Sequence, residues 1–170
     1  HQIPVACDIP EKNLILDDKV DAIVIPGGMP GTLNLEKSAA VQKAIEDIKP
    51  DAVIHCAAWT AVDLAEDEDK KETVFAVNAK GTENIAMACK KVNCKMMYIS
   101  TDYVFDGQGE TPWEADCKDY APQNVYGMSK LEGEKAVAKT LEKYFIVRIA
   151  WVFGKNGNNF IKTMLNLSKK

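Results

Sequence analysis

The 170-residue sequence lacks several features that mark large classes of proteins. It has no apolar run near the roughly 20 residues that a membrane-spanning helix needs, and Asp8, Glu11 and Asp17 interrupt any apolar core of a signal peptide. Among its 21 cationic residues the one arginine is Arg148, and the formal net charge is −4. Without arginine forks or a basic surplus, nucleic-acid binding is not expected. We therefore predict a cytoplasmic protein that binds neither nucleic acid nor a membrane.

Cysteine and histidine are too few and too scattered for a metal site or a disulfide framework. The five cysteines show no C-x-x-C spacing, and the two histidines cannot complete a repeated zinc spacing with them. Scattered thiols of this kind are typical of a reducing compartment. A chain of this length can bury roughly 70% of its unfolded surface around a single core. We predict one domain over residues 1–170, without a metal.

Short apolar runs of strand length alternate with longer helical stretches, which is typical of a parallel sheet covered by helices. The predicted strands are 3–7, 21–26, 51–56, 95–100 and 145–151, and the predicted helices are 34–48, 67–92 with a break near Gly81, 123–143 and 158–168. The strands do not alternate apolar with polar residues, so we expect burial on both faces. The predicted fold is a three-layer α/β/α sandwich with a mainly parallel sheet of about five strands. Strand 3–7 should lie at an edge, and exposed edges could pair two copies of the chain into a homo-oligomer.

Tyr126 and Lys130 form a Tyr-x-x-x-Lys pattern, which on a predicted helix places a phenol and an ammonium one turn apart on the same face. A nearby cation favours phenolate, so Lys130 could lower the pKa of Tyr126 and make it a general acid for a carbonyl being reduced. Thr101 closes the fourth predicted strand, where its hydroxyl could hydrogen-bond the same carbonyl oxygen. From the residues alone, a solvated helix pair and an ordinary Ser/Thr turn remain alternative interpretations.

From about Lys49 onward the sequence resembles the dTDP-4-dehydrorhamnose reductases, which are extended short-chain dehydrogenases with a Rossmann fold. The resemblance covers about 120 of the 170 residues and rests on KPDAVIHCAAWTAVDLAE, VNAKGTENIAMACK, YISTDYVFDG, YAPQNVYGMSKLEGE and RIAWVFGKNGNNF. It implies that Thr101, Tyr126 and Lys130 are a catalytic trio. In that family the matching tyrosine is the proton donor, and the lysine also holds the nicotinamide ribose of NADH or NADPH.

The same resemblance implies substrate contacts from Asp102 and Tyr103 and cofactor contacts from the turn Ala57-Ala58. Two expected parts of such a site are missing from the sequence. No G-x-x-G-x-x-G turn is present to hold the cofactor pyrophosphate, and the family would continue beyond Lys170 into a nucleotide-sugar-binding lobe.

Residues 5–48 include the string PGGMPGTLNL and resemble another family, the PfpI-like intracellular proteases and deglycases, which have a flavodoxin-like fold. In that family the glycine amides form an oxyanion hole beside a nucleophilic cysteine at the end of the next strand. The resemblance implies that role for Cys56, although a buried cysteine more often acts as a small hydrophobic residue. Gly27, Gly28 and Gly31 could instead form an anion nest for a cofactor phosphate, or simply a tight turn.

The two resemblances together predict a recombined or engineered chimera, with a flavodoxin-like segment 1–48 joined near Ile48 to a Rossmann segment 49–170. We expect a folded hybrid domain without robust native catalytic activity, because an intact trio does not by itself supply near-attack geometry. One alternative is an NAD(P)H-dependent reductase of a dTDP-4-keto-6-deoxy sugar, with the turn from Gly27 to Gly31 replacing the lost phosphate loop. The other alternative is a hydrolase or deglycase that depends on Cys56.

Overall fold

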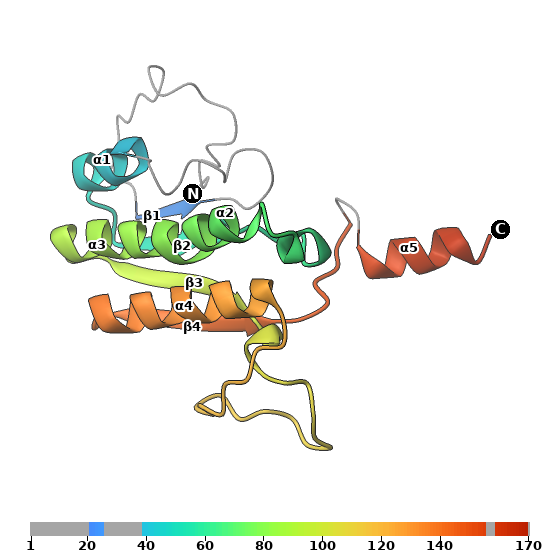
Figure 1. Cartoon of the computed structure of the whole chain (residues 1–170). Helices are drawn as coiled ribbons and strands as arrows, with labels where there is room; N and C mark the ends of the chain where they lie inside the picture. Colours follow the sequence, from blue (N-terminus) through green and yellow to red (C-terminus); the bar gives the residue numbers. More distant parts are fainter. Residues whose placement is uncertain (1–20, 26–38, 156–158, 170) are drawn as a thin grey trace.

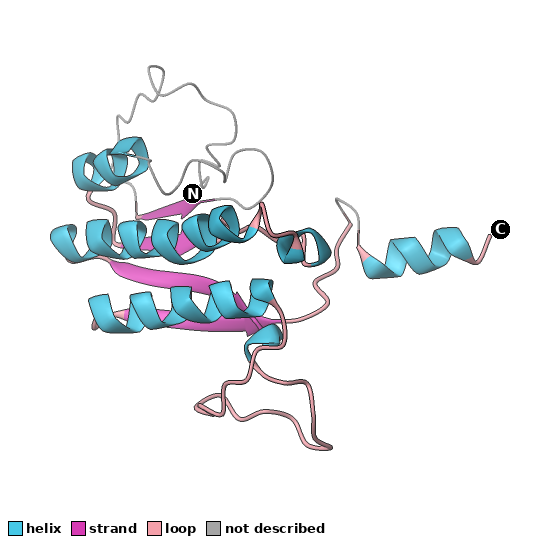
Figure 2. Ribbon diagram, in the orientation of Figure 1, coloured by secondary structure: helices cyan, strands magenta, loops and turns pink. Residues whose placement is uncertain are grey.

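The computed structural model describes residues 21–25, 39–155 and 159–169. In this part of the chain a parallel sheet has the strand order β1-β2-β3-β4 (Figures 1 and 2). The strands are β1 (Ala22–Ile25), β2 (Ala52–His55), β3 (Lys95–Thr101) and β4 (Tyr144–Ile149). These are the predicted strands 21–26, 51–56, 95–100 and 145–151, and they lie side by side as expected. The described sheet therefore has 4 strands rather than about five, and the predicted strand 3–7 lies outside the described residues.

The helices follow the strands in the alternation that the sequence predicts. They are α1 (Ala39–Ile48), α2 (Lys71–Phe75), α3 (Thr82–Val92), α4 (Val125–Thr140) and α5 (Phe160–Leu167), with a π-helical segment η4 (Ala76–Gly81) and the 3-10 turns η3 (Asp63–Glu66) and η5 (Asp102–Val104). The predicted helix 67–92 is the run α2, η4 and α3, so the break expected near Gly81 is a widened π turn rather than an interruption.

Helices α1, α3 and α4 pack against one another and cover one face of the sheet (Figure 1). Right-handed crossovers between strands that follow one another across a parallel sheet place every connecting helix on the same face. On that face Tyr98 is fully buried, whereas Phe145, which points to the other face, is 63% exposed. In the described residues the expected burial of both strand faces and the expected third layer are therefore absent, and no flavodoxin-like hybrid is seen.

The approach of α4 to the sheet depends on glycine. A Cβ atom at Gly133 would collide with the hydroxyl of Tyr98 and the backbone carbonyl of Asn78. The helix begins where the side chain of Asn124 accepts a hydrogen bond from the Gly127 backbone N–H at 2.7 Å, which satisfies one of the free donors of the first turn. Its first residues are thereby fixed beside the carboxyl end of β3.

Helix α5 extends away from the sheet at the C-terminal end of the chain (Figure 1). None of the helices in the described ranges has the length and apolar content that a bilayer crossing requires.

Candidate active site

A cavity of about 590 Å³ opens at the carboxyl ends of β2, β3 and β4, where ligands collect in open parallel sheets. Among the residues that line it are Thr101, Asp102, Tyr103, Tyr126 and Lys130, for which the reductase resemblance implies catalytic or substrate-binding roles. These residues come from the end of β3, from η5 and from the first two turns of α4. The strand and helix that carry them are adjacent because α4 crosses back over β3 before β4 begins.

Thr101 holds the turn that follows β3. Its hydroxyl donates to the Asp102 carboxylate at 3.1 Å and accepts from the Tyr103 backbone N–H at 3.2 Å. The Tyr103 ring meets the Tyr126 ring edge to face, with 5.8 Å between the ring centroids. A Cβ at Gly127 would collide with the Tyr103 carbonyl, so a glycine in the first turn of α4 is what lets this turn lie against the helix.

Burial raises the pKa of Tyr126, and contact with the Thr101 hydroxyl lowers it in part. Lys130 was expected to lower this pKa, but the structure gives the opposite overall direction, because desolvation disfavours the phenolate. Tyr126 is therefore a phenol at neutral pH, which is the protonation state that a proton donor needs.

Lys130 is 2% exposed and is held by two contacts with β3. Its Nζ donates to the Ile99 carbonyl at 2.7 Å and lies 4.1 Å from the centre of the Tyr98 ring. Burial lowers the pKa of Lys130 to about 7, while the charge of Glu134 acts in the opposite direction. This lysine can therefore change its charge near neutral pH, which an exposed lysine does not.

Cys56 lines the cavity, but it lacks the environment of a nucleophile. Burial raises the pKa of its thiol, more than Lys130 lowers it. No helix begins directly after Cys56, since the next turn starts at Asp63, so no helix N-terminus stabilises a thiolate there. Gly27, Gly28 and Gly31, which were expected beside it, lie outside the described residues.

Ala57 and Ala58, both expected at the cofactor, have different environments in the structure. Ala58 lines the cavity, whereas Ala57 packs in the hydrophobic core with Ile25 and Val53. Ser100 also lines the cavity, and its buried hydroxyl oxygen has no hydrogen-bond partner among the described residues. A polar ligand group in the cavity would satisfy this oxygen, since buried polar atoms are nearly always hydrogen-bonded.

Asn78 was not expected to contribute to the site. Its side chain accepts from the Trp59 backbone N–H at 2.8 Å and donates to the Trp59 carbonyl at 3.1 Å and to the Ser129 hydroxyl at 2.9 Å. It therefore fastens the segment after β2, which lines the cavity, to α4. The sequence signal was weak, an asparagine between the apolar residues Val77 and Ala79, and its full burial is seen only in the structure.

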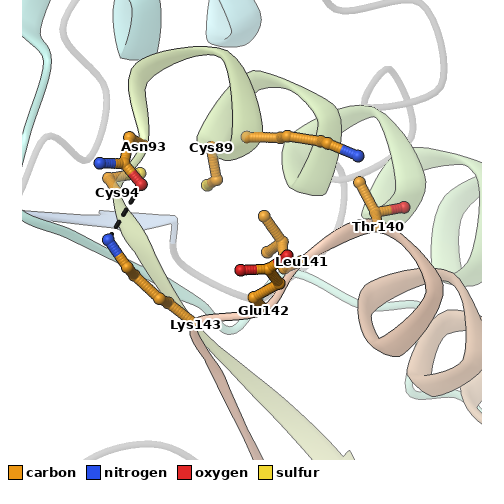
Figure 3. Close-up of a pocket in the computed structure, with 8 residues that line it drawn as sticks. Cys89, Asn93, Cys94, Thr140, Leu141, Glu142 and Lys143 are labelled. Carbon is orange, nitrogen blue, oxygen red and sulfur yellow. Dashed lines mark hydrogen bonds between the residues drawn. The ribbon is translucent and has the colours of Figure 1, made fainter.

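Figure 3 shows a second cavity, of about 220 Å³, between the C-terminal ends of α3 and α4. Cys89, Cys94 and Leu141 line it, and Lys143 donates to Asn93 across its mouth at 3.0 Å. It lies at the amino ends of β3 and β4, whereas the predicted site residues lie at the carboxyl ends of the strands. Cys89 and Cys94 are free thiols.

Residues 15–170 match the family described as the RmlD substrate binding domain. The chain is 40% identical to a dTDP-4-dehydrorhamnose reductase from Streptomyces griseus over 90% of its own length and 49% of that protein. It is 46% identical to the enzyme of that name from Escherichia coli K12, over 76% of its own length and 42% of the relative. A crystal structure of the Bacillus anthracis dTDP-4-dehydrorhamnose reductase in complex with NADP superposes with a TM-score of 0.79 at 36% identity, covering 88% of this chain and 60% of that one. The chain thus spans about half the length of the curated relatives.

These matches correct the prediction of a recombined domain without robust catalytic activity. The family match begins at residue 15, within the segment that resembles the PfpI-like family, and continues through the predicted junction near Ile48. The comparisons support the reductase resemblance and give no support to a PfpI-like part. The leading prediction was wrong because α/β families share the same strand-turn-helix units, so a short glycine-rich string does not distinguish one family from another. This chain belongs to the RmlD substrate binding domain family.

Proposed function

We propose that the chain catalyses the NAD(P)H-dependent reduction of the keto group of a dTDP-4-keto-6-deoxy sugar. The observation that carries this proposal is that Thr101, Tyr126 and Lys130 line one cavity at the carboxyl ends of the parallel strands. The substrate class follows from the names of relatives that are 40% and 46% identical, and the cofactor follows from a structural relative solved with NADP.

The residues in the cavity suit the nicotinamide and the attached ribose of the cofactor. Lys130 and Ser100 would hold its ribose, because one offers an ammonium and the other a buried oxygen without a partner among the described residues. Ala58 would lie against it at the end of the neighbouring strand. When bound, the cofactor supplies the hydride.

Residues of this chain supply the proton for the reaction. Tyr126 is a phenol at neutral pH, so it donates its proton to the carbonyl oxygen as the oxygen becomes negative. Thr101 would donate a hydrogen bond to the same oxygen in place of the bond that it gives to the Asp102 carboxylate. Lys130, when protonated, would stabilise the phenolate that remains on Tyr126. Asp102 and Tyr103 would contact the sugar from the edge of the cavity.

The proposal is tested by following NADPH and NADH oxidation in the presence of dTDP-4-keto-6-deoxy sugar with the wild type and Tyr126→Phe. Removing the phenolic proton should reduce kcat by about 100-fold or more, the usual contribution of a general acid. Tyr144→Phe is the matched control. Tyr144 lies at the amino end of β4, away from the cavity at the carboxyl ends of the strands, so this variant should keep the wild-type rate. Equal rates for the wild type and Tyr126→Phe, or a wild type that oxidises neither cofactor, would contradict the proposal.

A further inference from the structure

Arg148 of β4 and Glu134 of α4 form a partly buried, bidentate ion pair. Arg148 Nε donates to Glu134 Oε1 at 2.9 Å, and Nη2 donates to Oε2 at 2.7 Å. The side chains are 18% and 4% exposed, respectively, whereas the other ion pairs of the described ranges lie at the surface. An almost fully buried carboxylate such as Glu134 is costly without a well-placed partner, so the bidentate contact with Arg148 holds both side chains in one geometry.

The guanidinium of Arg148 also supports the long loop 106–122. Its Nη2 donates to the Tyr120 hydroxyl at 2.9 Å, and its Cζ lies 5.1 Å from the centre of the Phe105 ring and 5.2 Å from that of Tyr120. Phe105 in turn stacks on Trp113, with 4.5 Å between the ring centroids. The residues at the two ends of the loop, Phe105 and Tyr120, thus contact one cation, and Trp113 in its middle is joined to that cluster through Phe105.

This loop joins the two halves of the candidate active site. Thr101 and η5 precede it, and the Asn124 cap and Tyr126 follow it. The Ala121 backbone N–H donates to the Val104 carbonyl at 3.1 Å, which closes the base of the loop. The packing of the aromatic side chains on Arg148 therefore affects the relative positions of Thr101 and Tyr126.

Glu134 also lies near Lys130, which is one turn earlier on α4. Several titratable groups surround Lys130. They are His55 at the end of β2 and Cys56 after it, Tyr98 of β3, Asp102 of η5, and Tyr126 and Glu134 of α4. Burial keeps the histidine, the thiol and both phenols neutral. Asp102 acts on Tyr126 rather than on Lys130. Glu134 is thus the carboxylate whose charge opposes the loss of the Lys130 proton.

We propose that Glu134 and Arg148 are positioning residues of the active site, in which Glu134 keeps Lys130 protonated and Arg148 holds both Glu134 and the aromatic loop. This inference rests on the proposed function, because that function gives Lys130 its task. The physical claim, however, concerns the charge of one lysine and the order of one loop, and both can be measured without turnover.

The first test follows the titration of Lys130 by NMR of ¹³C-labelled lysine, with Lys130→Met to assign the signal. Glu134→Gln should lower the midpoint by about one pH unit, the smaller end of the effect of a close opposite charge. Glu132→Gln is the matched control, because Glu132 lies on the same helix but pairs with Lys135 at the surface, and it should leave the midpoint unchanged. If the wild type proves active, the alkaline limb of its pH-rate profile should move to lower pH by the same amount in Glu134→Gln.

The second test uses Arg148→Lys, which keeps the charge beside Glu134 but loses the two-pronged geometry and the stacking surface. Amide hydrogen exchange over residues 106–122 should become at least about tenfold faster, with exchange in β3 unchanged as evidence that the sheet is folded. An unshifted Lys130 midpoint in Glu134→Gln, or unchanged loop exchange in Arg148→Lys, would overturn the inference. A wild type without reductase activity but with both expected shifts would instead count against the proposed function alone.

Discussion

At the scale of single residues, burial decides which groups around the cavity carry charge. His55, Tyr98 and Lys130 are nearly or fully buried, and desolvation is the largest influence on the pKa of each. The same physical cause therefore keeps Tyr98 protonated and His55 neutral, while it makes Lys130 titrate near neutral pH. Burial disfavours the charged form of each group, and whether the group is an acid or a base sets the direction in which its pKa moves.

His55 provides a test of this effect that does not depend on catalysis. Burial lowers the pKa of His55 from 6.5 to about 3, so below pH 6.5 the unfolded chain binds a proton that the folded chain does not. The free energy of unfolding should then fall as the pH falls from 6.5 toward 3, by up to about 1.4 kcal/mol per pH unit.

The measurement is urea unfolding at several pH values for the wild type and for His55→Gln. The glutamine amide is long enough to hydrogen-bond Thr82, the partner of His55 Nε2 at 3.0 Å, but it does not titrate. The difference in stability between the two proteins should shrink as the pH falls below 6.5. A difference that stays constant over this range would contradict the account.

At the scale of elements, the site depends on how closely α4 lies on β3. Gly133 faces Tyr98 and Asn78 at that contact, with no room for a Cβ atom. Gly133→Ala should lower the free energy of unfolding by about 1–3 kcal/mol through overpacking, although alanine by itself favours a helix by about 1 kcal/mol.

Thermal and urea unfolding would measure this effect, with Glu132→Ala as the control on the exposed side of the same helix. That control should change stability by no more than about 0.5 kcal/mol. Equal or greater stability of Gly133→Ala would show that α4 does not need the close approach described here.

The elements themselves were largely predictable, and the contacts between them were not. Apolar runs locate all four described strands, and Tyr126 and Lys130 were expected on one helix beside Thr101. The Arg148–Glu134 pair was not predictable, because its partners belong to different elements and no local pattern joins them. The exposure of Phe145 was also missed, since an apolar strand sequence does not say how many helix layers cover it.

At the scale of the whole molecule, the family match runs continuously from residue 15 to residue 170. Two α/β families share the same strand-turn-helix units, so a short glycine-rich segment such as PGGMPG can resemble either of them. The longer stretch from β2 to α5, with its site residues converging on one cavity, distinguishes the two possibilities more reliably. Reductase function in this family member therefore requires that the cavity receives a nicotinamide cofactor.

Isothermal titration calorimetry with NADPH and with NADH, on the wild type and Lys130→Met, tests that claim most directly. We predict saturable binding in the micromolar range to the wild type and affinity at least about tenfold weaker for Lys130→Met, which lacks a charged hydrogen-bond donor to the ribose. No binding of either cofactor up to millimolar concentrations, or equal affinity for both proteins, would contradict the assignment of this cavity as a reductase site.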